Sequence, residues 1–324
     1  MAPTPAAAAP ARPDGGEAGG GVVWVANHAL ESDPGSTLTP IDLGDRRAGP
    51  PVTTASQPSA VAPWTDGRIL VVNEGKNTLS VLSTRSGTVS ATVEVGLEPD
   101  AVALTHLPTG GGWLALVANF GGDSVTPVNL DSMRAGRPIP VGAQPVAVAM
   151  ARGKPGVPGT ALVANFGAGT VTPIALATMT PGPPIAVGTA PDAVAVQDTG
   201  SPTGPLALVA DFGSDQVTPV TLPTLTATPP VTVGGNPTGI AVAPDHTAWV
   251  VAGDTLTPLP PGSPAAGTPL TLPGVGQAVV LRGGSTAWVA EQAGAVVPVR
   301  LPAGPAGKPV PVGGRPTALA LAPS

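Results

Sequence analysis

A short aliphatic motif that recurs seven times constrains the fold of this chain more than any other feature. Its first copy is Trp24-Val25-Ala26-Asn27, and the later copies begin at Leu70, Leu116, Leu162, Leu208, Val250 and Trp288. The first five copies start 46 residues apart, and the last two gaps are 42 and 38 residues. A regular period in the forties, with strand-forming residues in every unit, is typical of a radial or stacked repeat.

Each repeat predicts four short strands. In the unit that opens at Pro145, apolar runs at residues 145–150, 160–164, 170–176 and 184–187 are separated by turns rich in Gly and Pro. The first run contains only small and medium residues, which suits an innermost strand near a crowded axis. Seven such units predict an all-β fold, a seven-bladed β-propeller of four-stranded antiparallel blades.

The two ends of the chain are expected to close the ring. The repeat begins with a second strand at residues 22–26 and ends with an inner strand at residues 316–321. We predict that residues 318–321 lie beside residues 22–26, so that the C-terminal strand completes the N-terminal blade. The repeat therefore forms one domain over residues 22–324, preceded by an Ala/Pro/Gly-rich tail at residues 1–21 that is expected to be disordered.

Prolines inside the third run of six units conflict with a strand, because proline cannot donate to a ladder. They are Pro40, Pro127, Pro173, Pro219, Pro258 and Pro298, whereas the second unit has Ser80 at this position. We expect each proline to lie at a bulge, or where its missing N–H would have pointed away from a partner.

Composition excludes several classes of function. The chain has no Cys, so disulfides, thiolate catalysis and Cys-ligated metals are excluded. The net charge of −6 and the scattered Lys and Arg argue against nucleic acid. No apolar run is long enough to span a membrane. We expect a monomer, and the composition of the tail slightly favours an extracytoplasmic location over a cytoplasmic one.

The repeat resembles the YVTN-type β-propeller repeat. Asn27, Asn73, Asn119 and Asn165 match the asparagine of that motif, with Leu or Trp in place of its tyrosine. Its Val-Gly-x-x-Pro element opens at Val95, Val141, Val187, Val233 and Val312. The resemblance covers about 300 residues and implies the seven-bladed fold. Similar rings include lactonases, a streptogramin lyase and electron-transfer subunits, so it does not define a function.

The resemblance also implies where a ligand would bind. The loops before the inner strand and after the second strand open on one face, around the central channel. This channel mouth would collect six candidate ligand-binding residues, Glu98, Asp100, Gln144, Asp192, Asn236 and Arg315, with Thr317 beside them and Glu74, Asp123, Asp215 and Asp254 further out. Glu98, Asp100, Asp192 and Asn236 could supply oxygen ligands for Ca²⁺ or Mg²⁺, or the acids could simply be solvated at loop ends.

Aromatic and amide side chains at the repeat turns have two interpretations each. Phe120, Phe166 and Phe212 follow the motif in three consecutive units; they could form an apolar stripe for a partner or pack between blades. The motif asparagines are expected to bond their own backbone in Asx-type turns rather than a ligand.

No catalytic motif is present. The chain lacks a nucleophile elbow, a P-loop and a glycine-rich dinucleotide fingerprint, and its three His residues are not expected to cluster. We therefore expect a non-enzymatic binding or scaffold propeller that uses the channel mouth for a protein or small-molecule ligand, without a cofactor. The alternative is a lactonase- or lyase-type enzyme with a divalent cation, Ca²⁺ or Mg²⁺, in the channel.

Overall fold

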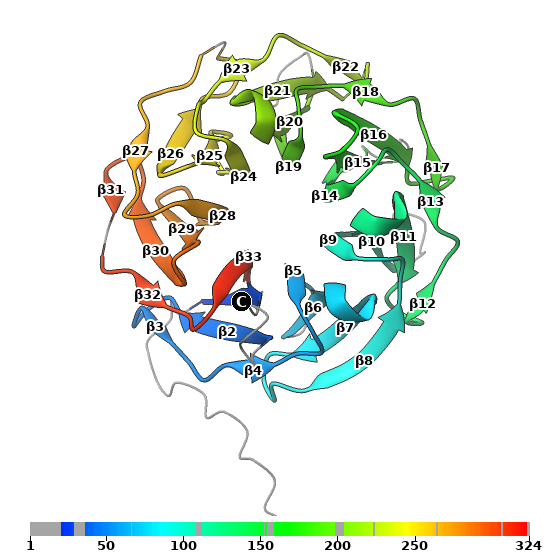
Figure 1. Ribbon diagram of the computed structural model, residues 1–324, viewed down its shortest axis with the longest axis horizontal. Helices are drawn as coiled ribbons and strands as arrows, with labels where there is room; N and C mark the ends of the chain where they lie inside the picture. Colours follow the sequence, from blue (N-terminus) through cyan, green and yellow to red (C-terminus); the bar gives the residue numbers. More distant parts are fainter. Residues whose placement is uncertain are drawn as a thin grey trace, which may run out of the picture.

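The computed structural model describes residues 21–28, 36–65, 67–107, 112–151, 153, 159–197, 204–222, 224–263, 265–305 and 307–322. In these ranges the strands form seven antiparallel sheets, arranged as blades around a central opening (Figure 1). The seven-bladed β-propeller predicted from the repeat is confirmed. The predicted N-terminal tail lies outside the described residues, apart from Gly21.

Each blade runs from an inner strand at the axis to outer strands at the rim (Figure 1). In blades 1 to 7 the inner strands are β33 (Arg315–Leu321), β5 (Pro58–Pro63), β9 (Pro99–His106), β14 (Pro145–Ala151), β19 (Pro191–Gln197), β24 (Pro237–Val242) and β28 (Gly276–Arg282). The second strands are β1 (Val22–His28), β6 (Arg68–Asn73), β10 (Trp113–Asn119), β15 (Thr160–Asn165), β20 (Leu206–Asp211), β25 (Ala248–Ala252) and β29 (Thr286–Glu291).

The third strands are β2 (Thr37–Asp42), β7 (Thr78–Ser83), β11 (Ser124–Asn129), β16 (Thr170–Ala175), β21 (Gln216–Thr221), β26 (Thr255–Leu259) and β30 (Ala295–Arg300). Three blades also have a short 3-10 helix in the turn after the second strand: η1 (Glu74–Lys76), η2 (Phe120–Gly122) and η3 (Phe212–Ser214). None of the helices in the described ranges has the length and apolar character that a membrane-spanning helix needs.

The outer strand is divided in five of the six blades whose third strand contains proline. Two-residue pieces form it in blades 1, 3, 4, 5 and 7: β3 (Arg47–Ala48) and β4 (Val52–Thr53), β12 (Arg134–Ala135) and β13 (Ile139–Pro140), β17 (Thr180–Pro181) and β18 (Ile185–Ala186), β22 (Thr226–Ala227) and β23 (Val231–Thr232), β31 (Gly304–Pro305) and β32 (Val310–Pro311). In blade 6 the described residues form a single outer piece, β27 (Leu270–Thr271). Blade 2, with Ser80, has an unbroken strand, β8 (Val89–Glu94).

Backbone geometry explains this division. The proline carbonyls point toward the rim, where those of Pro40, Pro127 and Pro173 each accept an N–H from a glycine at 2.7 Å. The N–H and C=O of one residue point to the same side of an antiparallel strand, so each proline nitrogen also faces the rim, at the gap between the outer pieces. The expected placement of the missing N–H is confirmed. The first outer piece, such as β17, was not predicted from the sequence.

The core lies between the blades rather than within one of them. Buried residues form seven clusters, and each cluster joins two neighbouring blades. The second strands show why: Val23 and Val25 pack in the cluster between blades 7 and 1, whereas Trp24 and Ala26 pack in the cluster between blades 1 and 2. Alternate side chains of one strand thus bury both faces of the blade.

The last strand closes the ring as predicted. β33 pairs antiparallel with β1, with Leu319 opposite Val25 and Ala318 opposite Ala26. Blade 1 is therefore built from both ends of the described chain, and opening the ring would break this ladder.

Candidate functional site

A β-bulge near the start of every inner strand creates a ring of side chains at the channel mouth. In each blade the register with the second strand shifts by one residue after the first pair. The residues left over at these bulges, in blades 1 to 7, are Thr317, Ser59, Asp100, Val146, Asp192, Thr238 and Gln277. Bulges redirect side chains, and here they define one equivalent position in every blade.

Hydroxyl groups at this position connect neighbouring blades. The Ser59 hydroxyl donates to the Pro99 carbonyl at 2.8 Å, and the Thr317 hydroxyl donates to the Pro58 carbonyl at 3.1 Å. Thr238 makes the corresponding bond to Gly276 at 3.4 Å. Three of the seven blades therefore use a hydroxyl donor at the bulge to bind the next blade.

Asp100 and Asp192 occupy the same position but cannot act as donors when ionised. Both are half-buried, and neither side chain forms a hydrogen bond or ion pair with a described residue. Burial, together with the negative charges of Glu74 and Asp192, raises the pKa of Asp100 from 3.8 to about 7. Burial raises the pKa of Asp192 from 3.8 to about 6. The charge of Asp192 thus acts on Asp100, and Asp100 is partly protonated near neutral pH.

Glu98, Gln144 and Asn236 occupy a second equivalent position, just before the inner strand. Their φ angles of 47°, 54° and 52° are left-handed, and all three residues are exposed at the rim of the mouth. The Asn236 side-chain amide donates to the Phe212 carbonyl at 2.9 Å. The side chains of Glu98 and Gln144 form no hydrogen bond with a described residue, so they are available to a ligand.

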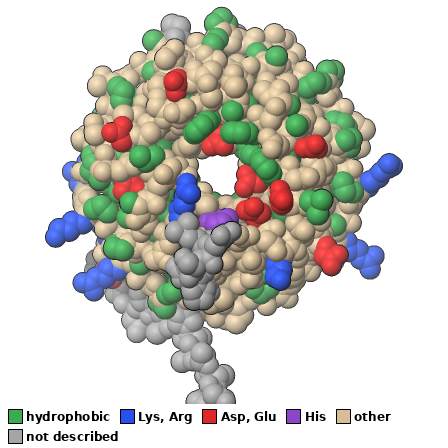
Figure 2. All heavy atoms as spheres, in the orientation of Figure 1, with side chains coloured by type: hydrophobic (Ala, Val, Ile, Leu, Met, Phe, Trp, Pro, Cys, Tyr) green, Lys and Arg blue, Asp and Glu red, His purple; other side chains and the backbone are tan. Residues whose placement is uncertain are grey.

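Arg315 begins β33, across the opening from β14 (Figure 1). It is exposed, and it lies opposite His28 in the β1–β33 ladder. Figure 2 shows acidic side chains along one part of the edge of the opening and a basic side chain with a histidine on another part. The mouth is therefore electrostatically asymmetric.

A metal site does not follow from these positions. Within the described ranges, no group of three or more His, Cys, Asp or Glu side chains is placed to hold a metal ion. Of the predicted cation ligands, Asp100 is affected by the negative charge of Asp192, and also by that of Glu74 further out. Asn236 donates its side-chain amide to a backbone carbonyl.

The three phenylalanines are half-buried on the same face. Phe166 and Phe212, from blades 4 and 5, have ring centroids 6.4 Å apart with a tilt of 43°. This pair contributes to packing across one blade junction. Whether the exposed part of Phe120, Phe166 and Phe212 binds a partner stays a prediction.

The prediction of Asx turns for the motif asparagines was wrong. Asn27, Asn73, Asn119 and Asn165 are fully buried. Each donates from Nδ2 to a third-strand hydroxyl, as Asn165 does to Thr170 at 3.1 Å and to Thr172 at 2.9 Å. The signal was present in the sequence as Ser or Thr at alternate positions of the third run, because alternate residues share one face of a strand.

Two of the outer mouth acids are also structural. The Asp123 carboxylate accepts the Gln144 N–H at 2.8 Å, and the Asp215 carboxylate accepts the Asn236 N–H at 2.7 Å. They hold the loop of the next blade, a role that was not predicted from the sequence, which placed them further out on this face.

Comparisons with known proteins support the fold. No family model and no curated protein matches the chain. Among solved structures it is similar to a provisionally assigned 6-phosphogluconolactonase from Bacteroides uniformis, with a TM-score of 0.72 and 15% identity, covering 93% of this chain and 99% of that one. A functionally unknown protein from Desulfotomaculum acetoxidans gives 0.72 and 16%, covering 93% and 98%.

A streptogramin B lyase is also similar, with a TM-score of 0.68 and 11% identity, covering 92% of this chain and 91% of that one. At such low identities the likeness establishes the fold and no more. The chain is a seven-bladed β-propeller with neighbours of several different activities.

Proposed function

We propose that this chain is a non-enzymatic binding or scaffold propeller of the YVTN type that binds a cationic group of its ligand or partner at the channel mouth. The proposed contacts are Asp100 and Asp192 in the channel wall, with Glu98, Gln144, Asn236 and Arg315 around them. Phe120, Phe166 and Phe212 would add apolar contacts further out on the same face.

The observation that carries this proposal is the replacement of bulge hydroxyls by carboxylates. Ser59, Thr238 and Thr317 stabilise the ring through bonds between blades. Asp100 and Asp192 give up that bond when ionised and are desolvated without a described cationic partner. Groups that oppose stability in this way are commonly kept for a ligand.

A bound cation would offset both the desolvation of the two carboxylates and the loss of their hydrogen bonds. An ammonium or guanidinium group between the carboxylates would favour their ionised forms and supply the missing hydrogen-bond donors. Binding near pH 6.5 should therefore release protons, and salt should weaken it.

Calorimetric titration tests the proposal with a tri-arginine peptide as the cationic probe and tri-citrulline as its uncharged counterpart. The wild-type protein should bind tri-arginine and not tri-citrulline. The matched variant is Asp100→Ser/Asp192→Thr, which carries the hydroxyls found in other blades and should bind at least tenfold more weakly. Equal binding by the variant, or none by the wild type, would refute the proposal.

A divalent-cation enzyme of lactonase or lyase type is the second candidate. The pKa of Asp100, near 7, would suit proton transfer at neutral pH. Hydrolysis of a lactone that requires Ca²⁺ or Mg²⁺ and is lost in Asp100→Ser/Asp192→Thr would establish this alternative and overturn the non-enzymatic proposal.

A further inference from the structure

Four blade junctions share a side-chain contact that fixes the loop of the next blade. The residue before the third strand accepts the N–H of the residue before the next inner strand. The acceptor oxygens belong to Ser36, Asn77, Asp123 and Asp215, and the donors are Gln57, Glu98, Gln144 and Asn236, at 2.7–2.8 Å.

The junction between blades 4 and 5 keeps the backbone of this contact but lacks its acceptor. Gly169 holds the acceptor position, with φ of 62°, and its carbonyl still accepts the Val187 N–H at 3.1 Å. Ala190 holds the donor position, with φ of 51°. Because glycine has no side-chain oxygen, the Ala190 N–H forms no hydrogen bond within the described part of the chain.

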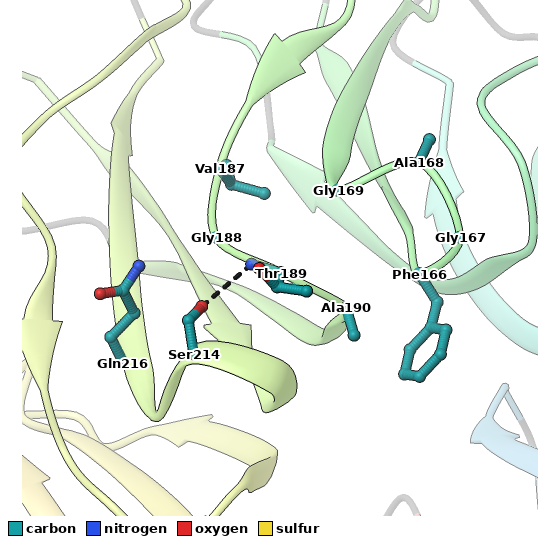
Figure 3. A pocket seen from close by; sticks show the side chains of 10 residues that line it. All are labelled: Phe166, Gly167, Ala168, Gly169, Val187, Gly188, Thr189, Ala190, Ser214 and Gln216. Atoms are coloured by element: carbon teal, nitrogen blue, oxygen red, sulfur yellow. Dashed lines mark hydrogen bonds between the residues drawn. The ribbon is translucent and has the colours of Figure 1, made fainter.

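A groove of about 640 Å³ lies at this place. Gly169, Val187, Gly188, Ala190 and Ser214 line it, together with Phe166, Gly167, Ala168, Thr189 and Gln216. Figure 3 shows Gly169 close to the segment that carries Val187 and Gly188, with Ser214 and Gln216 on the other side of that segment.

Ser214 adds a second polar group. Its Oγ accepts the Thr189 N–H at 2.9 Å (Figure 3). The hydroxyl hydrogen has no acceptor among the described residues, so Ser214 can still donate to a ligand.

The negative charge of Asp211, next to the groove, determines which kind of hydrogen-bond acceptor a ligand can place there. The side chain of Asp211 lies close to Gly188, a lining residue, since a methyl group added to Gly188 would come within 2.6 Å of Asp211. A ligand carboxylate would be repelled by this group, whereas a neutral oxygen would not. The junction between blades 2 and 3 uses such an oxygen, from the carboxamide of Asn77.

We propose that this groove binds a neutral carboxamide or peptide carbonyl, whose oxygen takes the place of the missing side chain at residue 169. The Ala190 N–H and the Ser214 hydroxyl donate to the ligand, and Val187, Ala168 and Ala190 contact its alkyl part. The groove includes Phe166 of the proposed binding surface, but this proposal uses none of the channel-mouth acids and does not rest on the proposed function.

Nuclear magnetic resonance tests the proposal on the full chain with butyramide as the probe and butyrate as its charged isostere. Labelling with ¹³C-threonine and ¹⁵N-alanine restricts the observed amides to Thr–Ala pairs, which include Ala190. Butyramide should shift the Ala190 amide resonance at millimolar concentration, and butyrate should shift it severalfold less at pH 8. No shift with butyramide, or an equal shift with butyrate, would overturn the proposal.

Gly169→Asn supplies the matched variant, because Asn77 adopts a φ of 54° at the equivalent position. It should restore the contact and abolish the butyramide response. The reciprocal variant, Asn77→Gly, opens the same space between blades 2 and 3 and should give the Glu98 amide a response to butyramide. An unchanged Ala190 response in Gly169→Asn, or no new response in Asn77→Gly, contradicts the proposal.

Discussion

Asp211 is an acid at a position where four other blades have the motif asparagine. It is fully buried, and it accepts a hydrogen bond from the Thr218 hydroxyl. Burial raises its pKa from 3.8 to about 6, although bonds from Thr218 and Gly188 oppose that shift. The repeat thus tolerates an acid where four of its members place a neutral donor.

Asp211→Asn should stabilise the protein at pH 8 by about 1–3 kcal/mol, because the amide can donate to Thr218 as Asn165 does to Thr172. The gain should shrink at pH 5, where the wild-type carboxyl is largely protonated. Chemical denaturation at both pH values measures this. A less stable variant at pH 8, or an equal gain at both values, would contradict the interpretation.

For individual residues, the sequence predicted where a side chain lies more accurately than what it does. It placed Asp100 and Asp192 at equivalent sites near the axis, but not at bulges. The roles of Asp123 and Asp215 could not be predicted, because their acceptor contacts depend on how two blades are positioned relative to each other.

Within one blade, the continuity of the outer strand is related to the residue at one position of the third strand. Ser80 lies opposite Thr92 of the continuous strand β8, and its hydroxyl contacts Asn73 at 3.0 Å and Thr92 at 3.1 Å. Proline at this position in the other blades removes a donor, and in five of these six blades the outer strand is divided. The sequence predicted the prolines' orientation but not the division, because two-residue strands have no periodic pattern to detect.

Ser80→Pro should divide β8 and destabilise the protein by about 1–3 kcal/mol more than Ser80→Ala, which removes the hydroxyl but keeps the N–H. Denaturation curves and amide exchange in residues 89–94 measure this. Equal stability of the two variants, with β8 amides still protected, would show that the proline does not cause the division.

The ring as a whole contains several acids whose folded environment favours protonation. The pKa values of Asp100, Asp192 and Asp211 are raised, and burial also raises the pKa of Glu291. A group whose folded pKa lies above its unfolded pKa stabilises the folded protein at pH values below the unfolded pKa, about 4. This stabilisation is lost as the pH rises through the folded pKa.

The closure of the ring was predictable because the two incomplete units at the chain ends complement each other.

The melting temperature should therefore be several degrees higher at pH 5 than at pH 8. This is the reverse of acid denaturation, in which paired carboxylates lose their partners. A melting temperature that falls steadily from pH 8 to pH 5 would mean that these carboxyl groups are not desolvated in the folded ring.

Thermal unfolding of the wild-type protein and Asp100→Ser/Asp192→Thr at pH 8, each with and without tri-arginine, tests the central claim most directly. We predict that the variant alone melts at a higher temperature, since its hydroxyls can bond to the next blade, and that only the wild type is stabilised further by the peptide. A variant that melts lower, or that gains as much from the peptide, would show that the two carboxylates serve the architecture and not a ligand.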